Sequence, residues 1–291
     1  MRLVTVLASR GCEGGVLAGD GSIVPLKRWG LDSVEDLISA GPSAWETVER
    51  ESLGALSEWP REQRLASPVM TIPRNMFCIG LNYMSHYDEG QRHGEPMPES
   101  PIIFTKAWTT LIGPRDDIVV DRSATEKVDW EAELAVVIGT GGLDIPEDQA
   151  VSHVFGYCLA NDVSARDLQQ ANGRFSQWHK GKSLDGFCPL GPSLVSASEL
   201  SDLSGIRIEL YVNGVRKQDI WPKDMYHPIP RLISYLSMGM ALLPGDVILT
   251  GTGSGVGLWQ EPPEFLHEGD VVEIRSDVLG VLRNRVVDRR E

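Results

Sequence analysis

Short apolar segments broken by Gly and Pro recur along this chain, and in some of them apolar and polar residues alternate, a pattern typical of β-strands that bury one face. In residues 128–139, VDWEAELAVVIG, every second position from Trp130 to Ile138 is apolar, so these side chains are expected to point into a core. Asn213-Gly214, which follows IRIELYV, predicts a type I′ hairpin turn. Further short strands, separated by Gly and Pro, are predicted in NMFCIG, PIIFTK, DIVV, VFGYCLAND, DVILTG, VVEIR and VLRNRVV.

Helical patterns are few and short. They are predicted near residues 83–90, near 165–170, and over the segment PIPRLISYLSMGMAL that begins at Pro228. The sequence has neither the regular strand–helix alternation of a doubly wound sheet nor a repeat of solenoid length. We therefore predict a strand-rich α+β fold for residues 68–291.

Residues 1–67 are predicted to form a small N-terminal α+β domain. The strand RLVTVLAS is followed by GGVLAG and SIVPL, which flank the turn Gly19-Asp20-Gly21 and predict a hairpin. Ser33 is the expected start of a helix over VEDLISA, and a second helix is predicted over residues 44–58. No spacing typical of catalysis occurs in this unit, so we expect a structural role for it.

The charge balance narrows the classes of partner. Lys and Arg number 27 against 41 Asp and Glu, a formal net charge of −14. Such a chain repels phosphate backbones and anionic lipid at long range, so we expect no nucleic-acid or membrane partner. A small anionic substrate stays compatible, provided that cations gather locally.

The cysteines and the N-terminus favour a cytoplasmic protein. MRLVTVLASRG lacks the long apolar segment of a signal peptide, and no apolar stretch approaches the ~18–20 residues that span a bilayer. No pair of cysteines has CxxC spacing, so small buried thiols in a reducing compartment are expected rather than disulfides or a metal set. The four are Cys12, Cys78, Cys158 and Cys188.

Three carboxylates are candidate metal ligands. Glu131 and Glu133 share one face of the predicted strand, about 6.6 to 7 Å apart along the backbone, and Asp162 ends the strand GYCLAND. Like charges on a half-buried face repel, and a divalent ion would bring them together. Carboxylate-only ligands favour Mg²⁺ or Mn²⁺, with Ca²⁺ as a further possibility. The alternative is an edge strand whose glutamates face solvent.

A histidine and three cations are the remaining chemical candidates. His86 and Glu89 lie three residues apart and share a helical face, so the carboxylate can orient the imidazole as a general base. The alternative is a surface histidine, and Asp88 competes as its partner. Three cationic side chains are predicted to neutralise a substrate carboxylate or an enolate: Lys106, Arg166 and Lys182. The alternative is that they lie on the surface in contact with solvent.

An ordered set of motifs resembles the fumarylacetoacetate hydrolase family over residues 75–287. The motifs are GLNYMSHYDE, PIIFTK, VDWEAELAVVIG, GYCLANDVSARDLQ, GKSLDGFCPLGP, YVNG, LLPGDVILTGT and GVG. The resemblance implies the compact mixed β-sheet roll of that family, an accessory N-terminal domain of the kind many bacterial members carry, and a homodimer.

The resemblance also implies roles for individual residues. Gly253-Ser254 stands where the family usually has Pro-x, a departure that bears on the rigidity of this loop and on substrate preference. Tyr83 is a candidate substrate contact, the alternative being a packed core tyrosine. The family's matching positions imply a metal triad of Glu131, Glu133 and Asp162, a water-activating pair of His86 and Glu89, oxyanion and enolate stabilisation by Gln169 and Lys182, and a substrate contact by Thr252.

These parts predict a divalent-metal-dependent hydrolase that cleaves a C–C bond in an acylpyruvate, a β-diketo acid, by way of an enolate stabilised by the ion. Aromatic catabolism is the expected setting. The same parts would serve an oxaloacetate decarboxylase, an isomerase of an unsaturated 2-oxo diacid, or a sugar-acid dehydratase. Two other classes are weaker alternatives: a non-catalytic binding scaffold, and a thiol enzyme that uses Cys188 or Cys78.

Overall fold

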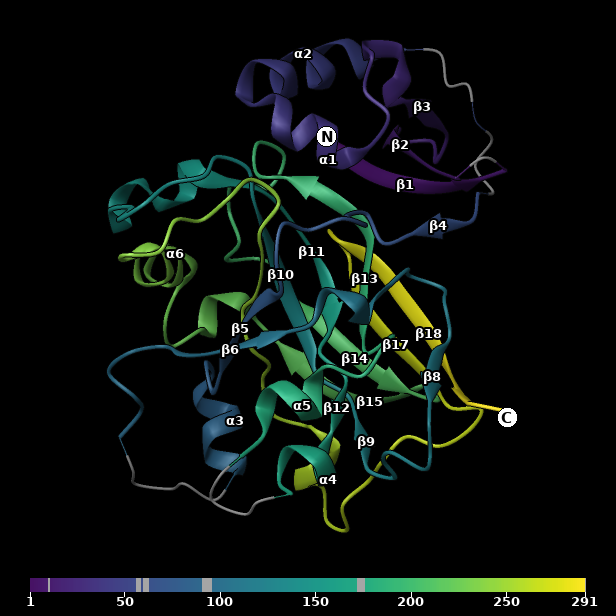
Figure 1. Cartoon of the computed structure of the whole chain (residues 1–291), viewed down its shortest axis with the longest axis vertical. Coiled ribbons are helices and arrows are strands. Elements are labelled where there is room, and N and C mark those ends of the chain that lie inside the picture. The colour runs from purple at the N-terminus through teal and green to yellow at the C-terminus, as the bar shows by residue number, and fades with distance from the viewer. Residues whose placement is uncertain (10, 56–58, 60–62, 91–95, 172–175, 291) are drawn as a thin grey trace.

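The computed structural model describes residues 1–9, 11–55, 59, 63–90, 96–171 and 176–290, and within them the chain forms one large and one small mixed β-sheet (Figure 1). The large sheet has the order β3 (Ile23–Pro25), β2 (Gly11–Leu17), β1 (Arg2–Ala8), β13 (Cys188–Ser196), β11 (Val154–Asn161), β10 (Ala132–Ile138), β16 (Val247–Leu249), β5 (Met76–Gly80) and β6 (Ile102–Lys106), with β4 (Leu65–Ala66) on β1 and β7 (Leu111–Ile112) on β13.

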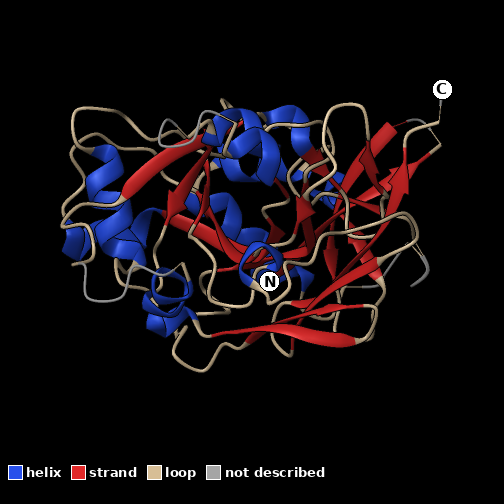
Figure 2. Ribbon diagram, turned by 90° about the horizontal axis from the view of Figure 1, so that it is seen from below, coloured by secondary structure: helices blue, strands red, loops and turns tan. Residues whose placement is uncertain are grey.

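The small sheet has the order β15 (Val215–Ile220), β14 (Ile208–Val212), β17 (Val271–Ser276), β18 (Gly280–Asp288) and β8 (Ile118–Val120), and β9 (Val128–Asp129) pairs with β12 (Ser164–Ala165). Seen from below, helices lie mostly toward one side and the periphery, while strands fill the side on which the C-terminus lies (Figure 2). The strand-rich α+β prediction is confirmed.

The helices are short. The α-helices are α1 (Val34–Ala40), α2 (Pro42–Ser52), α3 (Met84–Glu89), α4 (Arg166–Gln169), α5 (Trp178–Lys182) and α6 (Ile229–Ser237). The 3-10 turns are η1 (Leu26–Trp29), η2 (Trp108–Thr110), η3 (Glu147–His153), η4 (Pro222–Asp224) and η5 (Gly257–Trp259). Among the described residues, no helix is long and apolar enough to cross a membrane.

Strand β10 lies between two hydrophobic cores. Leu134 and Val136 pack into the core between the two sheets, whereas Ala135 and Val137 on the other face pack into a second core. Side chains of α1 and of β13 also belong to this second core. Both edges of β10 are paired, with β11 and β16, and both of its faces pack into a core, so the strand is buried on all sides.

The predicted strand over residues 128–139 is interrupted. Trp130 and Glu131 lie between β9 and β10, where side-chain acceptors replace the ladder partners. The Trp130 N–H donates to Oδ1 of Asp129 at 2.8 Å, and the Glu131 N–H donates to Oδ1 of Asn161 at 3.0 Å. The predicted hairpin is confirmed, because Asn213 and Gly214 both have positive φ, 50° and 80°.

The helix predicted over VEDLISA is confirmed as α1, whereas the other predicted helices are right in place and too long. The helix from Pro228 ends at Ser237, since Gly239 adopts a φ of 68° and donates its N–H to Asp144. The second N-terminal helix spans Pro42–Ser52 and not 44–58, of which residues 56–58 lie outside the described part. Helix α5 was not predicted at all.

The N-terminal unit is joined to the rest by backbone pairing. Ser33 caps α1 as predicted, in a reciprocal capping box with Asp36. Strand β1, however, pairs with β13, so the large sheet runs from the N-terminal unit into the remainder of the chain. The boundary at residue 67 stays a prediction.

The prediction of four buried thiols is wrong for one cysteine. Cys12 is exposed, because it lies near the end of the β1–β2 hairpin, opposite Leu7, where only one face of the ribbon is covered. Cys78, Cys158 and Cys188 are buried, and all four are free.

Candidate active site

The candidate residues gather at the end of the large sheet remote from the N-terminal unit (Figure 1). Glu131 directly precedes β10, Glu133 is its second residue, and Asp162 directly follows β11. Because β10 and β11 are antiparallel neighbours, with Ala132 opposite Asn161, the start of one strand meets the end of the other. Helices α3, α4 and α5 lie around this end (Figure 1).

The three carboxylates form a buried cluster. Glu131, Glu133 and Asp162 each contribute an oxygen, and these oxygens all lie within 4.8 Å of one another. None of the three side chains is at an edge or in solvent, so the alternative of a solvated edge strand is wrong. The cluster therefore has the composition and spacing needed to hold a metal ion.

The carboxylates of the cluster differ in their electrostatic surroundings, and their pKa values shift in different directions. Burial alone would raise the pKa of Glu131, but Lys182 and Arg166 outweigh it and lower that pKa to about 2. The pKa of Glu133 is raised well above its ordinary range, first by burial and then by Asp162 and Glu131. Glu133 is thus the carboxylate that most lacks a compensating positive charge.

Two further observations fit a hard cation at this place. Oε2 of Glu133 accepts one N–H, from Gly251 at 2.7 Å. The hydroxyl of Tyr83 is buried without a hydrogen-bond partner, and the proximity of Glu133 contributes to the raised pKa of that phenol. The oxygens of Glu131 and Asp162 each contact a cation, but a carboxylate oxygen has a second lone pair, so the buried trio beside the Tyr83 hydroxyl suits an oxygen-coordinated ion such as Mg²⁺ or Mn²⁺.

The three predicted cations are all buried, so their alternative of surface solvation is wrong. Lys182 Nζ lies 2.6 Å from Oε2 of Glu131 and 2.7 Å from Oδ2 of Asp162. Lys106 Nζ donates to Oδ1 of Asp162 at 2.6 Å. Burial disfavours the charged form of Lys182, yet Asp162 and Glu131 prevail and raise its pKa, so it stays protonated.

His86 is held by its predicted partner. Nδ1 of His86 lies 2.9 Å from Oε1 of Glu89, and Oε2 of Glu89 accepts the N–H of Gly255 at 2.6 Å. Glu89, and not Asp88, is therefore the carboxylate that orients the ring. An ionised Glu89 fixes the proton on Nδ1 and leaves the lone pair on Nε2 for a reacting proton.

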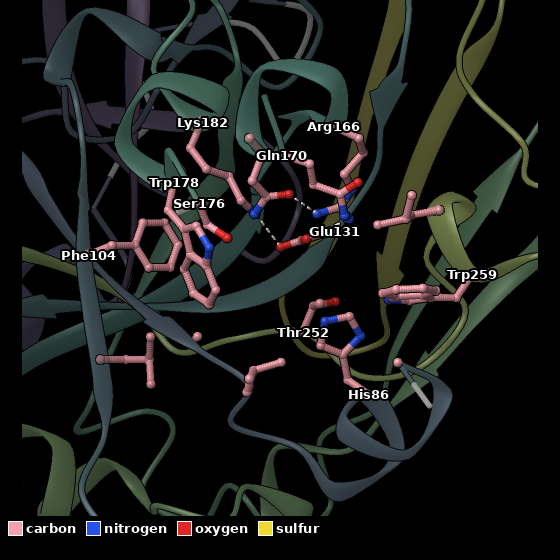
Figure 3. Close-up of a pocket in the computed structure, with 16 residues that line it drawn as sticks. His86, Phe104, Glu131, Arg166, Gln170, Ser176, Trp178, Lys182, Thr252 and Trp259 are labelled. Atoms are coloured by element: carbon pink, nitrogen blue, oxygen red, sulfur yellow. Dashed lines mark hydrogen bonds and ion pairs between the residues drawn. The ribbon is translucent and has the colours of Figure 1, made fainter. Parts of the chain in front are cut away.

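A cavity of about 120 Å³ within the described residues connects these groups (Figure 3). Its size is below the roughly 150 Å³ of an engineered cavity that holds benzene, so it suits a compact ligand. Six of the predicted residues line it: His86, Glu131, Arg166, Gln169, Lys182 and Thr252. Tyr83 and Lys106 do not line it, so direct substrate contact by these two residues stays a prediction.

The loop after β16 is tied down despite its departure from the family pattern. Thr252 Oγ1 donates to the carbonyl of Ala132 at 2.8 Å and accepts from Nε2 of Gln218 at 2.9 Å. The same Nε2 donates to the carbonyl of Gly253 at 3.0 Å. Gln218 thus fixes a loop in which the usual proline is absent.

Several wall residues were missed from the sequence. Phe104 and Trp178 form one side of the cavity, with ring centroids 5.1 Å apart, and Trp259 lies on another side (Figure 3). Asp129 holds Arg166 through Nε at 2.7 Å. Its position two residues before Glu131 was the available signal, whereas nothing local marks an aromatic residue as part of a cavity wall.

The thiol alternative is not supported. Burial raises the pKa of Cys188 to about 12 and that of Cys78 well above its ordinary value. Neither sulfur would be a thiolate near neutral pH, and neither residue lines the cavity.

A strand-rich roll with a buried carboxylate trio, a carboxylate-held histidine and buried cations around one cavity is an arrangement for acid–base chemistry on an anionic substrate. The family model described as fumarylacetoacetate (FAA) hydrolase C-terminal matches residues 75–287. The chain belongs to the fumarylacetoacetate hydrolase family and is an enzyme of that family.

Several named proteins are similar to this chain over most of its length. The chain is 41% identical over 242 residues to "Oxaloacetate tautomerase YisK" of Bacillus subtilis (strain 168). The matched region covers 83% of this chain and 79% of the relative. The chain is 42% identical over 243 residues to human mitochondrial "Oxaloacetate tautomerase FAHD2A", covering 83% and 76%. The solved fumarylacetoacetate hydrolase of psychrophilic Exiguobacterium antarcticum superimposes with a TM-score of 0.83 at 34% identity, covering 99% and 100%.

Proposed function

We propose that this chain catalyses the keto–enol tautomerisation of a short 2-oxo diacid, with oxaloacetate as the first candidate. The observation that carries the proposal is the position of His86, held through Nδ1 by Glu89 at 2.9 Å, on a cavity that Arg166 and Lys182 also line. The names of the two tautomerase relatives support the same reaction.

The charge of the site suits a dianion. The site contains four buried carboxylates and three buried cationic side chains, which give a net charge of about −1 when all are ionised. A bound divalent ion changes that net charge to about +1. A substrate with two carboxylates is attracted to such a site, whereas a neutral ketone gains nothing from it. The carboxylates are Asp129, Glu131, Glu133 and Asp162, and the cations are Lys106, Arg166 and Lys182.

The proposed ion is Mg²⁺, with Mn²⁺ and Ca²⁺ as alternatives, held by Glu131, Glu133 and Asp162. When bound, it supplies Lewis acidity to the oxygens of a 2-oxo acid and so acidifies the adjacent C–H bond. Nε2 of His86 takes the proton from the carbon next to the keto group, the keto oxygen takes up a proton from water, and His86 returns its proton to water. Because keto and enol forms are isomers, the step needs no further reactant.

The other wall residues bind and orient the substrate. Arg166 lines the cavity, and its Nη2 forms an ion pair with Oε1 of Glu131 at 2.7 Å, so the guanidinium lies where it can add a charge-assisted contact to a substrate carboxylate. Lys182 lies on the same side of the cavity, and Thr252 presents its side chain near His86 (Figure 3).

An assay with freshly dissolved enol-oxaloacetate tests the proposal. Loss of the enol absorbance should be accelerated by the Mg²⁺-loaded protein, and His86→Gln should reduce the catalysed rate by about 10²-fold or more. His153→Gln is the matched control, because His153 bonds the carbonyl of Thr140 and does not line the cavity. Wild-type protein that adds nothing to the rate of Mg²⁺ alone would refute the proposal.

Hydrolysis of an acylpyruvate is the second candidate. The pair of His86 and Glu89 favours it, because the same Nε2 can take a proton from water. A panel of acylpyruvates assayed for release of two acids separates the candidates. Acid release at a higher kcat/KM than oxaloacetate tautomerisation would make hydrolysis the principal activity.

A further inference from the structure

Asp129 is a fully buried carboxylate with four hydrogen-bond donors around it. Oδ2 accepts Nε of Arg166 at 2.7 Å and the N–H of Leu258 at 3.0 Å. Oδ1 accepts the N–H of Trp130 at 2.8 Å and the N–H of Gly257 at 2.7 Å. One side chain therefore joins three segments: the residue pair before β10, helix α4, and the turn η5.

Each of these segments carries a part of the cavity. Glu131 follows Trp130 in the chain, Arg166 begins α4, and Leu258 lies in η5. Gly257 leaves no room for a side chain, since a Cβ there would lie 2.1 Å from the carbonyl oxygen of Glu264 and 2.7 Å from Oδ1 of Asp129. This part of the chain is therefore built around the carboxylate.

The guanidinium of Arg166 is divided among three neighbours. Nε is held by Asp129, and Nη1 donates to Oε1 of Gln169 at 3.0 Å. Nη2 forms an ion pair with Oε1 of Glu131 at 2.7 Å. A planar guanidinium fixed at two of its nitrogens has only one orientation left for the third.

We propose that Asp129 is the positioning residue that holds the guanidinium of Arg166 in this orientation at the cavity wall, where Arg166 meets a substrate carboxylate. The inference rests on the proposed function in one respect, namely that Arg166 binds a carboxylate of the substrate. Asp129 itself lies behind the wall and touches no substrate. Its effect on binding passes through Arg166.

Asp129→Asn is the variant that tests this. The amide keeps the volume and one acceptor oxygen, but an NH₂ group takes the place of Oδ2. This NH₂ group cannot accept the hydrogen bonds that Oδ2 received from Nε of Arg166 and from the N–H of Leu258. The loss of a charge-assisted hydrogen bond should free the guanidinium. At saturating Mg²⁺, affinity for oxalate measured by calorimetry should fall about tenfold, and the KM for oxaloacetate should rise more than kcat falls.

A double-variant cycle separates positioning from general destabilisation. Arg166→Ala should weaken oxalate binding at least as much, and adding Asp129→Asn to it should have little further effect. Asp246→Asn is the matched control: Asp246 is equally buried, holds Nε of Arg74 at 3.0 Å and accepts the N–H of Leu243 at 2.7 Å. It lies beside β16 at the far end of β10, so it should lower thermal stability and leave oxalate affinity unchanged.

Two results would overturn the inference. Asp129→Asn could weaken oxalate binding no more than Asp246→Asn does, or its effect could multiply with that of Arg166→Ala. If Asp129→Asn does not fold, Asp129→Glu replaces it in the test. This variant keeps the negative charge but displaces it, and it must show the same loss of oxalate affinity. Oxalate binding requires no turnover, so wild-type protein that binds oxalate without tautomerising oxaloacetate refutes the proposed function alone.

Discussion

Glu131 and Glu133 show how far two identical side chains on one strand face can diverge. Lys182 and Arg166 surround Glu131, whereas Glu133 has two carboxylates for neighbours, so their pKa values move in opposite directions. Alternation along the strand placed both on one face and predicted their convergence. It could not predict which of the two would be neutralised, because the cations come from residues 166 and 182, remote in sequence.

The raised pKa of Glu133 predicts a pH-dependent cost in the metal-free protein. A carboxyl whose pKa is higher folded than unfolded favours the folded state at low pH, and this contribution is lost as the pH rises from about 4.5 through the raised value. Glu133→Gln cannot titrate. With chelator present, the melting temperature of the wild type should therefore decrease relative to that of Glu133→Gln as the pH rises above about 4.5. A difference in melting temperature that does not change with pH would contradict the raised pKa of Glu133.

Substitution of Glu131 tests the metal cluster directly. Glu131→Gln keeps the volume but removes a charge from the trio, so Mn²⁺ affinity measured by paramagnetic titration should fall at least about tenfold. Glu209→Gln is the control, since Glu209 lies on the small sheet paired with Arg216 and Arg207. Unchanged Mn²⁺ affinity in Glu131→Gln would exclude this residue as a ligand.

At the scale of elements, prediction succeeded where the signal is periodic. Strands β10, β11 and β14 follow from alternation, and α1 follows from the Ser33 capping signal. Helix α5 was missed because its five residues, WHKGK, have no apolar period and contain a glycine. Its place is set by tertiary contact: Trp178 packs against Gly80 at the end of β5 and against Phe104 of β6.

The contact between β5 and α5 predicts the effect of a single methyl group. A Cβ at Gly80 would overlap the far edge of the Trp178 indole, so Gly80→Ala should push the ring into the cavity. The expected result is a several-fold higher KM for oxaloacetate and a loss of stability of about 1–3 kcal/mol. Gly205→Ala, where a Cβ has open space, should change neither quantity, and equal KM values for both variants would contradict the packing.

At the scale of the whole molecule, the large sheet was not predicted as one unit. The pairing of β1 with β13 joins residues nearly two hundred positions apart, and local patterns carry no information on such partners. The N-terminal unit was expected to be an accessory. In the structure it shares a core with the catalytic part, through residues such as Leu3, Leu37, Cys188 and Leu194.

Removal of residues 1–67 should therefore expose part of that core and leave β13 without its partner β1. We expect the truncated chain to aggregate, or to bind a hydrophobic dye strongly and to melt without a cooperative transition. A soluble fragment 68–291 with a cooperative melt and full Mg²⁺-dependent activity would instead show two independent domains.

The central claim is that His86 moves a proton at the carbon next to the keto group of a bound 2-oxo diacid. The most direct measurement follows enol-oxaloacetate by NMR in D₂O with Mg²⁺-loaded protein. We expect catalysed formation of the keto acid with one deuterium at that carbon, and loss of the catalysed rate in His86→Gln. Deuterium uptake at the rate of Mg²⁺ alone, or equal rates in wild type and His86→Gln, would contradict it.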